Sequence, residues 1–124
     1  MSYEMDLAKK PGYLHAIVTG RNTLENVVAY MKELREACVA RGVNRVLIEE
    51  RLTGRRLGTW DVYEVATQGS VRGAGLYDAI AYVDVHASGE LMKFAETVAY
   101  NRGIPIRLFA TVEEAETWIR AKAG

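Results

Sequence analysis

Hydrophobic and polar residues alternate along the chain in short segments that predict strands and helices in turn. Near the start, the segments 3–8 and 13–19 have the composition of strands. The residues between them, 10–13 (KPGY), fit a type II turn, in which proline sets φ and glycine takes the positive-φ position. The sequence therefore predicts an antiparallel hairpin at the N-terminal end.

A long helix is predicted from Asn22 to about Arg41, because apolar residues recur there at steps of three and four. Asn22 and Glu25 have the spacing of a capping box, and Gly42 suits the position after the last turn. The predicted apolar stripe consists of Leu24, Val27, Val28, Met31, Leu34 and Cys38.

The rest of the chain alternates between strand and helix signals. The further predicted strands are 46–48, 79–85 and 106–109, and the further predicted helices are 59–68, 91–101 and 111–119. Pro105 precedes the last strand and suits an edge position. The order ββαβαβαβα predicts one α/β domain over 1–124. It should contain a single mixed, mostly parallel five-stranded sheet with helices on both faces.

Composition excludes several classes of protein. Sixteen basic residues balance 16 acidic ones, so there is no cationic excess for nucleic-acid binding. The apolar runs are too short for stable membrane insertion, and the first ten residues lack the apolar core of a signal peptide. Two histidines and the lone Cys38 do not supply a zinc site, and no other cofactor motif is present. Cytoplasmic residence is expected.

The segment Glu49–Thr59 (EERLTGRRLGT) is the strongest candidate for a binding loop, because it leaves the carboxyl end of a central strand. Arg51, Arg55 and Arg56 could hold an anionic group beside the amides at Thr59. Alternatively, its own glutamates nearly neutralise the segment and make it a solvated loop. On either interpretation it is expected to be the most mobile internal segment.

Two aromatic residues and the histidines give weaker hypotheses. Trp60 and Tyr63 lie three apart on the predicted helix 59–68, where they form either one wall of an apolar ligand slot or part of the core. His86 follows a strand at the favoured end of the sheet, but the sequence shows neither an orienting partner nor a nucleophile for it. His15 is interpreted as a packed or edge-exposed residue, and Cys38 as a small core residue.

The arrangement resembles the STAS domain and, more closely, the small bacterial SpoIIAA-like proteins. The resemblance covers nearly the whole chain, and its most specific part is the FxxxxEAxxWI arrangement from Phe109 to Ile119. The other matching segments are YLHAIVTG (13–20), RVLIE (45–49) and AIAYV (79–83). Anti-sigma antagonists of this type carry a phosphorylatable serine after an Asp before the next helix. This chain has no Asp-Ser pair there, so Thr59 is interpreted as a helix cap.

The leading functional hypothesis is a non-enzymatic binding or regulatory module that forms a homodimer. The exposed backbone of an edge strand such as 106–109 would pair with the second copy. Seven tyrosines and two tryptophans supply aromatic side chains for the interface. The alternative is a carrier of a small apolar or acidic lipid-like ligand under the helix 59–68, by analogy with lipid-exchange folds. An enzyme using His86 and the arginine segment is a third, weaker hypothesis.

Overall fold

The computed structural model describes residues 3–54, 77–84, 89–101 and 105–123. Its elements in chain order are β1 (Tyr3–Lys10), β2 (Tyr13–Arg21), α1 (Leu24–Arg41), β3 (Arg45–Thr53), β4 (Ala79–Asp84), α3 (Gly89–Asn101), β5 (Ile106–Phe109) and α4 (Val112–Ala123). These agree with the predicted order of elements. The predicted helix over 59–68 lies outside the described residues.

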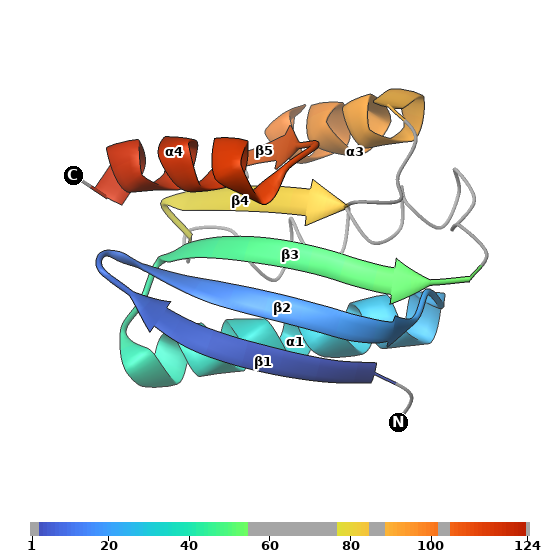
Figure 1. The fold of residues 1–124 in the computed structure, drawn as a ribbon, viewed down its shortest axis with the longest axis horizontal. Helices are drawn as coiled ribbons and strands as arrows, with labels where there is room; N and C mark the ends of the chain where they lie inside the picture. The colour runs from blue at the N-terminus through green and yellow to red at the C-terminus, as the bar shows by residue number, and fades with distance from the viewer. Residues whose placement is uncertain (1–2, 55–76, 85–88, 102–104, 124) are drawn as a thin grey trace.

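The five strands form one sheet in the order β1-β2-β3-β4-β5 (Figure 1). β1 runs antiparallel to β2, whereas β2, β3, β4 and β5 run parallel to one another. Gly12 has φ +86°, as the predicted type II turn requires. The predicted hairpin and the mostly parallel five-stranded sheet are therefore confirmed.

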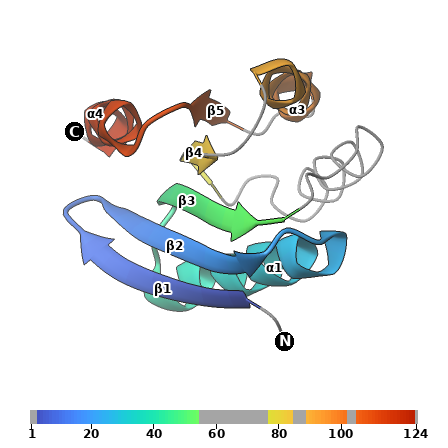
Figure 2. The same cartoon turned by 45° about the vertical axis from the view of Figure 1, so that its right-hand side comes forward.

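The helices are divided unequally between the two faces of the sheet. Each parallel strand is added next to the one before it, so right-handed crossovers place the connecting helices on one face. Among the described helices, Figure 2 shows α1 and α3 on that face, here called the α1 face, and α4 on the opposite face, the α4 face. Because α4 packs mainly on β4 and β3, no described helix covers the α4 face over β1 and most of β2 (Figure 1).

Each face has its own hydrophobic core. On the α1 face, the stripe of α1 packs against β2, β3 and β4, and the buried members include Val27, Leu34 and Cys38, as predicted. On the α4 face, Ala115 and Ile119 of α4 pack on Leu47 and neighbouring strand residues. Val27, Leu34 and Cys38 of the predicted α1 stripe are therefore confirmed as core residues, and Met31 packs against them partly buried, whereas Leu24 and Val28 are only half-buried.

The start of α1 differs from the prediction by one residue. Thr23, not Asn22, is the N-cap, and its hydroxyl oxygen accepts a hydrogen bond from the Asn26 amide at 3.1 Å. Asn22 instead donates its backbone N–H to the Thr53 carbonyl at 2.8 Å, which ties the helix entrance to the end of β3. The end of α1 is as predicted, because Gly42 adopts φ +66° there.

The predicted loop from residue 49 onward is wrong in its first part, because β3 continues to Thr53. β2 continues to Arg21 and offers backbone partners throughout, so that Thr19 pairs with Arg51 and Arg21 with Thr53. Continued pairing satisfies the backbone N–H and C=O groups that a loop would leave to water. The remainder of the predicted loop, from residue 55, lies outside the described residues.

Candidate functional site

Two consecutive glutamates of β3 are buried on opposite faces of the sheet. Glu49 and Glu50 were expected in a solvated loop, and this expectation is wrong, because only 6% of the surface of Glu49 and 2% of that of Glu50 is exposed. Successive side chains of a strand point to opposite faces, so Glu50 lies on the α1 face and Glu49 on the α4 face. Burying a carboxylate is costly unless it is hydrogen-bonded, and each of the two has its own set of partners.

Glu50 lies in a cluster with two phenols, here called the Glu50 cluster (Glu50, Tyr30, Tyr82 and Asp84). The hydroxyls of Tyr30, from α1, and Tyr82, from β4, both donate to Oε2 of Glu50. The two phenol oxygens lie 3.4 Å apart. Asp84 stands opposite Glu50 in the β3–β4 ladder. Three elements therefore meet at one carboxyl group near the carboxyl end of the sheet.

Burial dominates the acid–base properties of this cluster. It raises the pKa of the Glu50 carboxyl from 4.5 to about 7, against the opposing effect of the two phenol donors, and the Asp84 carboxyl raises it further. Burial and the neighbouring Glu50 charge also raise the pKa values of Tyr30 and Tyr82 well above 10, so both phenols keep their protons. The cluster can therefore gain or lose one proton near neutral pH, and Glu50 carries it.

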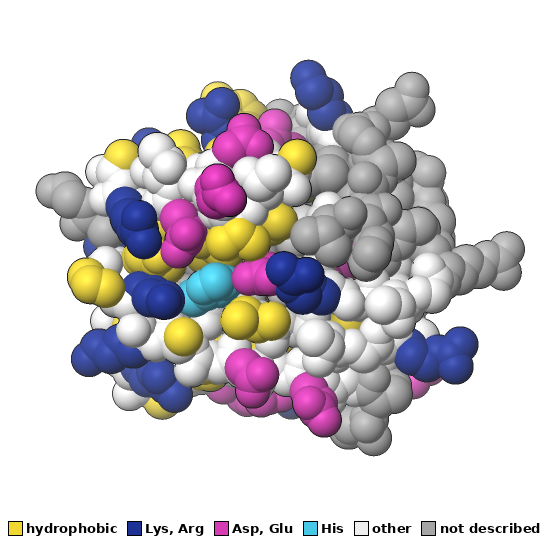
Figure 3. Space-filling view, viewed as in Figure 1, with side chains coloured by type: hydrophobic (Ala, Val, Ile, Leu, Met, Phe, Trp, Pro, Cys, Tyr) yellow, Lys and Arg dark blue, Asp and Glu magenta, His cyan; other side chains and the backbone are white. Residues whose placement is uncertain are grey.

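On the α4 face, Glu49 bridges a histidine and an arginine. Its Oε1 lies 2.9 Å from Nε2 of His15, and its Oε2 accepts from Nε of Arg51. His15 is 8% exposed, whereas the Arg51 side chain is 48% exposed. Figure 3 shows a histidine beside acidic and basic side chains in the middle of this face. The Glu49 side chain is therefore held between His15 and Arg51, and the Arg51 side chain remains accessible to water.

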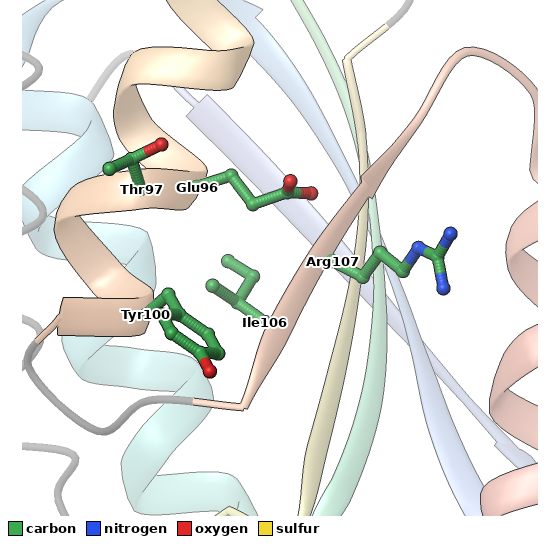
Figure 4. Close-up of a pocket in the computed structure, with 5 residues that line it drawn as sticks. All are labelled: Glu96, Thr97, Tyr100, Ile106 and Arg107. Carbon is green, nitrogen blue, oxygen red and sulfur yellow. The ribbon is translucent and has the colours of Figure 1, made fainter.

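A shallow groove of about 280 Å³ lies between α3 and the outer edge of β5, and it is lined by Glu96, Thr97, Tyr100, Ile106 and Arg107. Figure 4 shows Arg107 pointing away from α3, across β5. Tyr100 is 78% exposed at its rim. Glu96 accepts a hydrogen bond from the Leu108 backbone amide at 3.0 Å, so this carboxylate already occupies a donor of the β5 edge.

The fold agrees with a solved structure. The chain is similar to the crystal structure of an uncharacterised protein of the DUF3478 family, described as SpoIIAA-like in fold, from Shewanella loihica PV-4. The TM-score is 0.58 at 16% sequence identity, and the alignment covers 95% of this chain and 94% of the other. The chain has a SpoIIAA-like fold. No protein-family model and no curated protein matches its sequence.

Only one of the predicted site residues, Arg51, belongs to the part of this SpoIIAA-like chain that the structure describes. Arg51 lies at the end of β3 on the α4 face, paired with Glu49 instead of standing free in a loop. The other predicted site residues lie outside the described residues; they are Arg55, Arg56, Thr59, Trp60, Tyr63 and His86. Their proposed grouping into one binding site stays a prediction.

Two wider expectations concern metal ions and membranes. Within the described parts of the SpoIIAA-like chain, no three His, Cys, Asp or Glu side chains group closely enough to hold a metal ion. No described helix is both long and apolar enough to cross a bilayer. Cytoplasmic residence stays a prediction.

Sequence reasoning missed the residues of the Glu50 cluster. Tyr30 stands three residues after Val27 and four before Leu34, so the helical period already placed it on the buried stripe. Tyr82 lies within the predicted strand 79–85, which is apolar at almost every position. A buried phenol needs a hydrogen-bond partner, and that requirement was the available signal that a polar group lay nearby.

Proposed function

We propose that this SpoIIAA-like protein is a non-enzymatic binding module that works as a homodimer joined through the edge of β1. The observation that carries the proposal is the difference between the two edges of the sheet. β5 is four residues long, and Glu96 already bonds its Leu108 amide. β1 is eight residues long and pairs only with β2 among the described residues.

A long edge strand with unpaired backbone groups is a ready template for another strand. Proteins commonly shorten such edges or cover their backbone groups, and β5 has both features, because it is four residues long and its Leu108 amide is bonded to Glu96. β1 is eight residues long, and no described side chain forms a hydrogen bond with the backbone of its outer edge. The expected association site therefore moves from 106–109 to β1.

The bonding of the described acid–base groups supports a binding role over a catalytic one. His15 shares Glu49 with Arg51, and neither contact involves a hydroxyl or thiol that could act as a nucleophile. The carboxyl of Glu50 is held by Tyr30 and Tyr82 in the interior. Cys38 of α1 faces the core, where burial raises the pKa of its thiol.

The carrier alternative depends on Trp60 and Tyr63, which lie outside the described residues. It stays a prediction, and no described contact favours it.

Sedimentation velocity with light scattering tests the proposal directly. The purified chain should have twice its single-chain mass of 13.8 kDa at roughly tens of micromolar, where a standard-size interface persists. Dilution should shift the population toward the monomer. A mass of 13.8 kDa throughout that range refutes the homodimer.

A further inference from the structure

We infer that two β1 strands pair antiparallel about a two-fold axis at Leu7, so that Glu4 of each copy lies opposite Lys10 of the other. This inference rests on the proposed homodimer, and it adds the register and the side chains that determine it. The occupant of the β1 edge is a second copy of this chain. The argument uses the faces of β1, its charges and the side of α1 that lies next to it.

The register of β1 with β2 determines which side chains share a face. Glu4 stands opposite Thr19, and Lys10 stands opposite Tyr13. Tyr13 belongs to the core under α4, so Glu4, Asp6, Ala8 and Lys10 lie on the α4 face of the strand. A two-fold axis perpendicular to the sheet keeps each face continuous across the joint. Only residues of the same face can therefore stand opposite one another.

The charges of β1 select among the registers that meet this condition. An axis at Met5 places Glu4 opposite Asp6, and an axis at Asp6 places two Asp6 carboxylates opposite each other. Like charges directly opposite each other are destabilising, and opposite charges are stabilising. An axis at Leu7 instead gives two Glu4–Lys10 pairs and no pair of like charges.

An axis at Ala8 also brings opposite charges together, as Asp6 with Lys10, but it limits the ladder to residues 6–10. The axis at Leu7 pairs residues 4–10 and so engages more of the backbone edge. A seven-residue ladder and opposite-charge pairing therefore coincide in the register with the axis at Leu7.

The side of α1 next to β1 also permits two copies to approach. The Tyr3 hydroxyl donates to Glu33 of α1 at 2.5 Å, which identifies the side of the helix that lies over β1. Residues four apart share a side of a helix, so Ala29 and Ala37 flank Glu33 there. In the joined sheet the two α1 helices stand on the same face beside the axis. Small side chains let helix backbones come close without a steric clash.

A charge exchange tests the register. The Glu4→Lys variant places a lysine at position 4 opposite Lys10 of the other copy, so each opposite-charge pair becomes a like-charge pair. The dissociation constant of the dimer should then rise on the order of tenfold. Lys10→Glu should have the same effect. The double variant Glu4→Lys, Lys10→Glu restores opposite charges in the reversed order and should return the dissociation constant to within about threefold of the wild-type value. Sedimentation at several concentrations measures all four proteins.

Glu113→Lys on α4 is the matched control, since it makes the same change of charge at an exposed site away from β1. It should leave the dissociation constant unchanged. If the wild-type protein is a monomer, the proposed function itself fails. If the wild type is a dimer and the double variant stays as weak as the single variants, the homodimer stands and this register is wrong. Equal weakening by Glu113→Lys also overturns it, because the effect is then one of net charge.

Discussion

Replacing Glu50 by glutamine should remove most of the pH dependence of stability between pH 5 and 8. The folded protein holds the Glu50 proton up to about pH 7, whereas the ordinary carboxyl value in an unfolded chain is 4.5. Between these values the folded state binds one more proton than the unfolded state. The contribution of Glu50 to stability is therefore fully present below pH 4.5 and is lost as the pH rises through 7.

The magnitude follows from the width of that window. Each pH unit in which the folded state holds the extra proton changes the free energy of unfolding by about 1.4 kcal/mol. The window from 4.5 to about 7 therefore corresponds to about 3 kcal/mol lost by the wild type at alkaline pH. Glutamine keeps a carbonyl oxygen for the hydroxyls of Tyr30 and Tyr82 and carries no charge, so Glu50→Gln resembles the protonated wild type.

Urea unfolding followed by tryptophan fluorescence, from pH 5 to 8.5 at one protein concentration, measures the effect. Wild type and Glu50→Gln should have similar stability at pH 5, and the variant should be about 3 kcal/mol more stable at pH 8.5. Glu36→Gln, at an exposed position of α1, is the control and should follow the wild type. Parallel curves for wild type and Glu50→Gln would show that the two phenols stabilise the Glu50 anion enough to cancel its burial.

Two further predictions concern a helix cap and a sheet edge. Thr23→Ala should lower the free energy of unfolding by about 1 kcal/mol, because the Asn26 amide loses its acceptor. Thr23→Ser keeps the hydroxyl and should have nearly the stability of the wild type. Thermal unfolding of both variants shows whether the hydroxyl is the cause. Glu96→Ala should cost about 1 kcal/mol and let larger assemblies form at high concentration, since the Leu108 amide at the β5 edge becomes available. Light scattering that shows only the wild-type assembly would contradict the protective role of Glu96.

The order of elements was predictable because each signal for it is local. The KPGY turn, the 3.6-residue period of α1 and Gly42 each depend on residues a few positions apart. Sheet topology then followed from the handedness of crossovers and the alternation of strand and helix. The N-cap was misplaced by one residue because Asn22 and Thr23 are both good capping residues, and the contact of Asn22 with Thr53 decided between them.

The buried glutamates were not predictable from local pattern. Glu50 is surrounded by Tyr30, which lies 20 residues earlier, and Tyr82, which lies 32 residues later. A run such as EER after an apolar strand is typical of a loop, because charged residues are rarely buried without partners. The partners existed, but they came from other elements. The charge pattern therefore predicted the end of β3 too early, and with it the position of Arg51.

The sequential order of the strands has a consequence for how the chain folds during synthesis. Each parallel strand pairs with the strand before it, so the sheet extends in one direction from the N-terminal hairpin. The β1–β2–α1–β3 part already brings α1 onto its own strands, and Tyr30 reaches Glu50 before Tyr82 has been made. α4 arrives last and closes the second core. Each described strand can therefore pair with the preceding strand as soon as it has been synthesised. No described strand has to insert between two strands that have already paired.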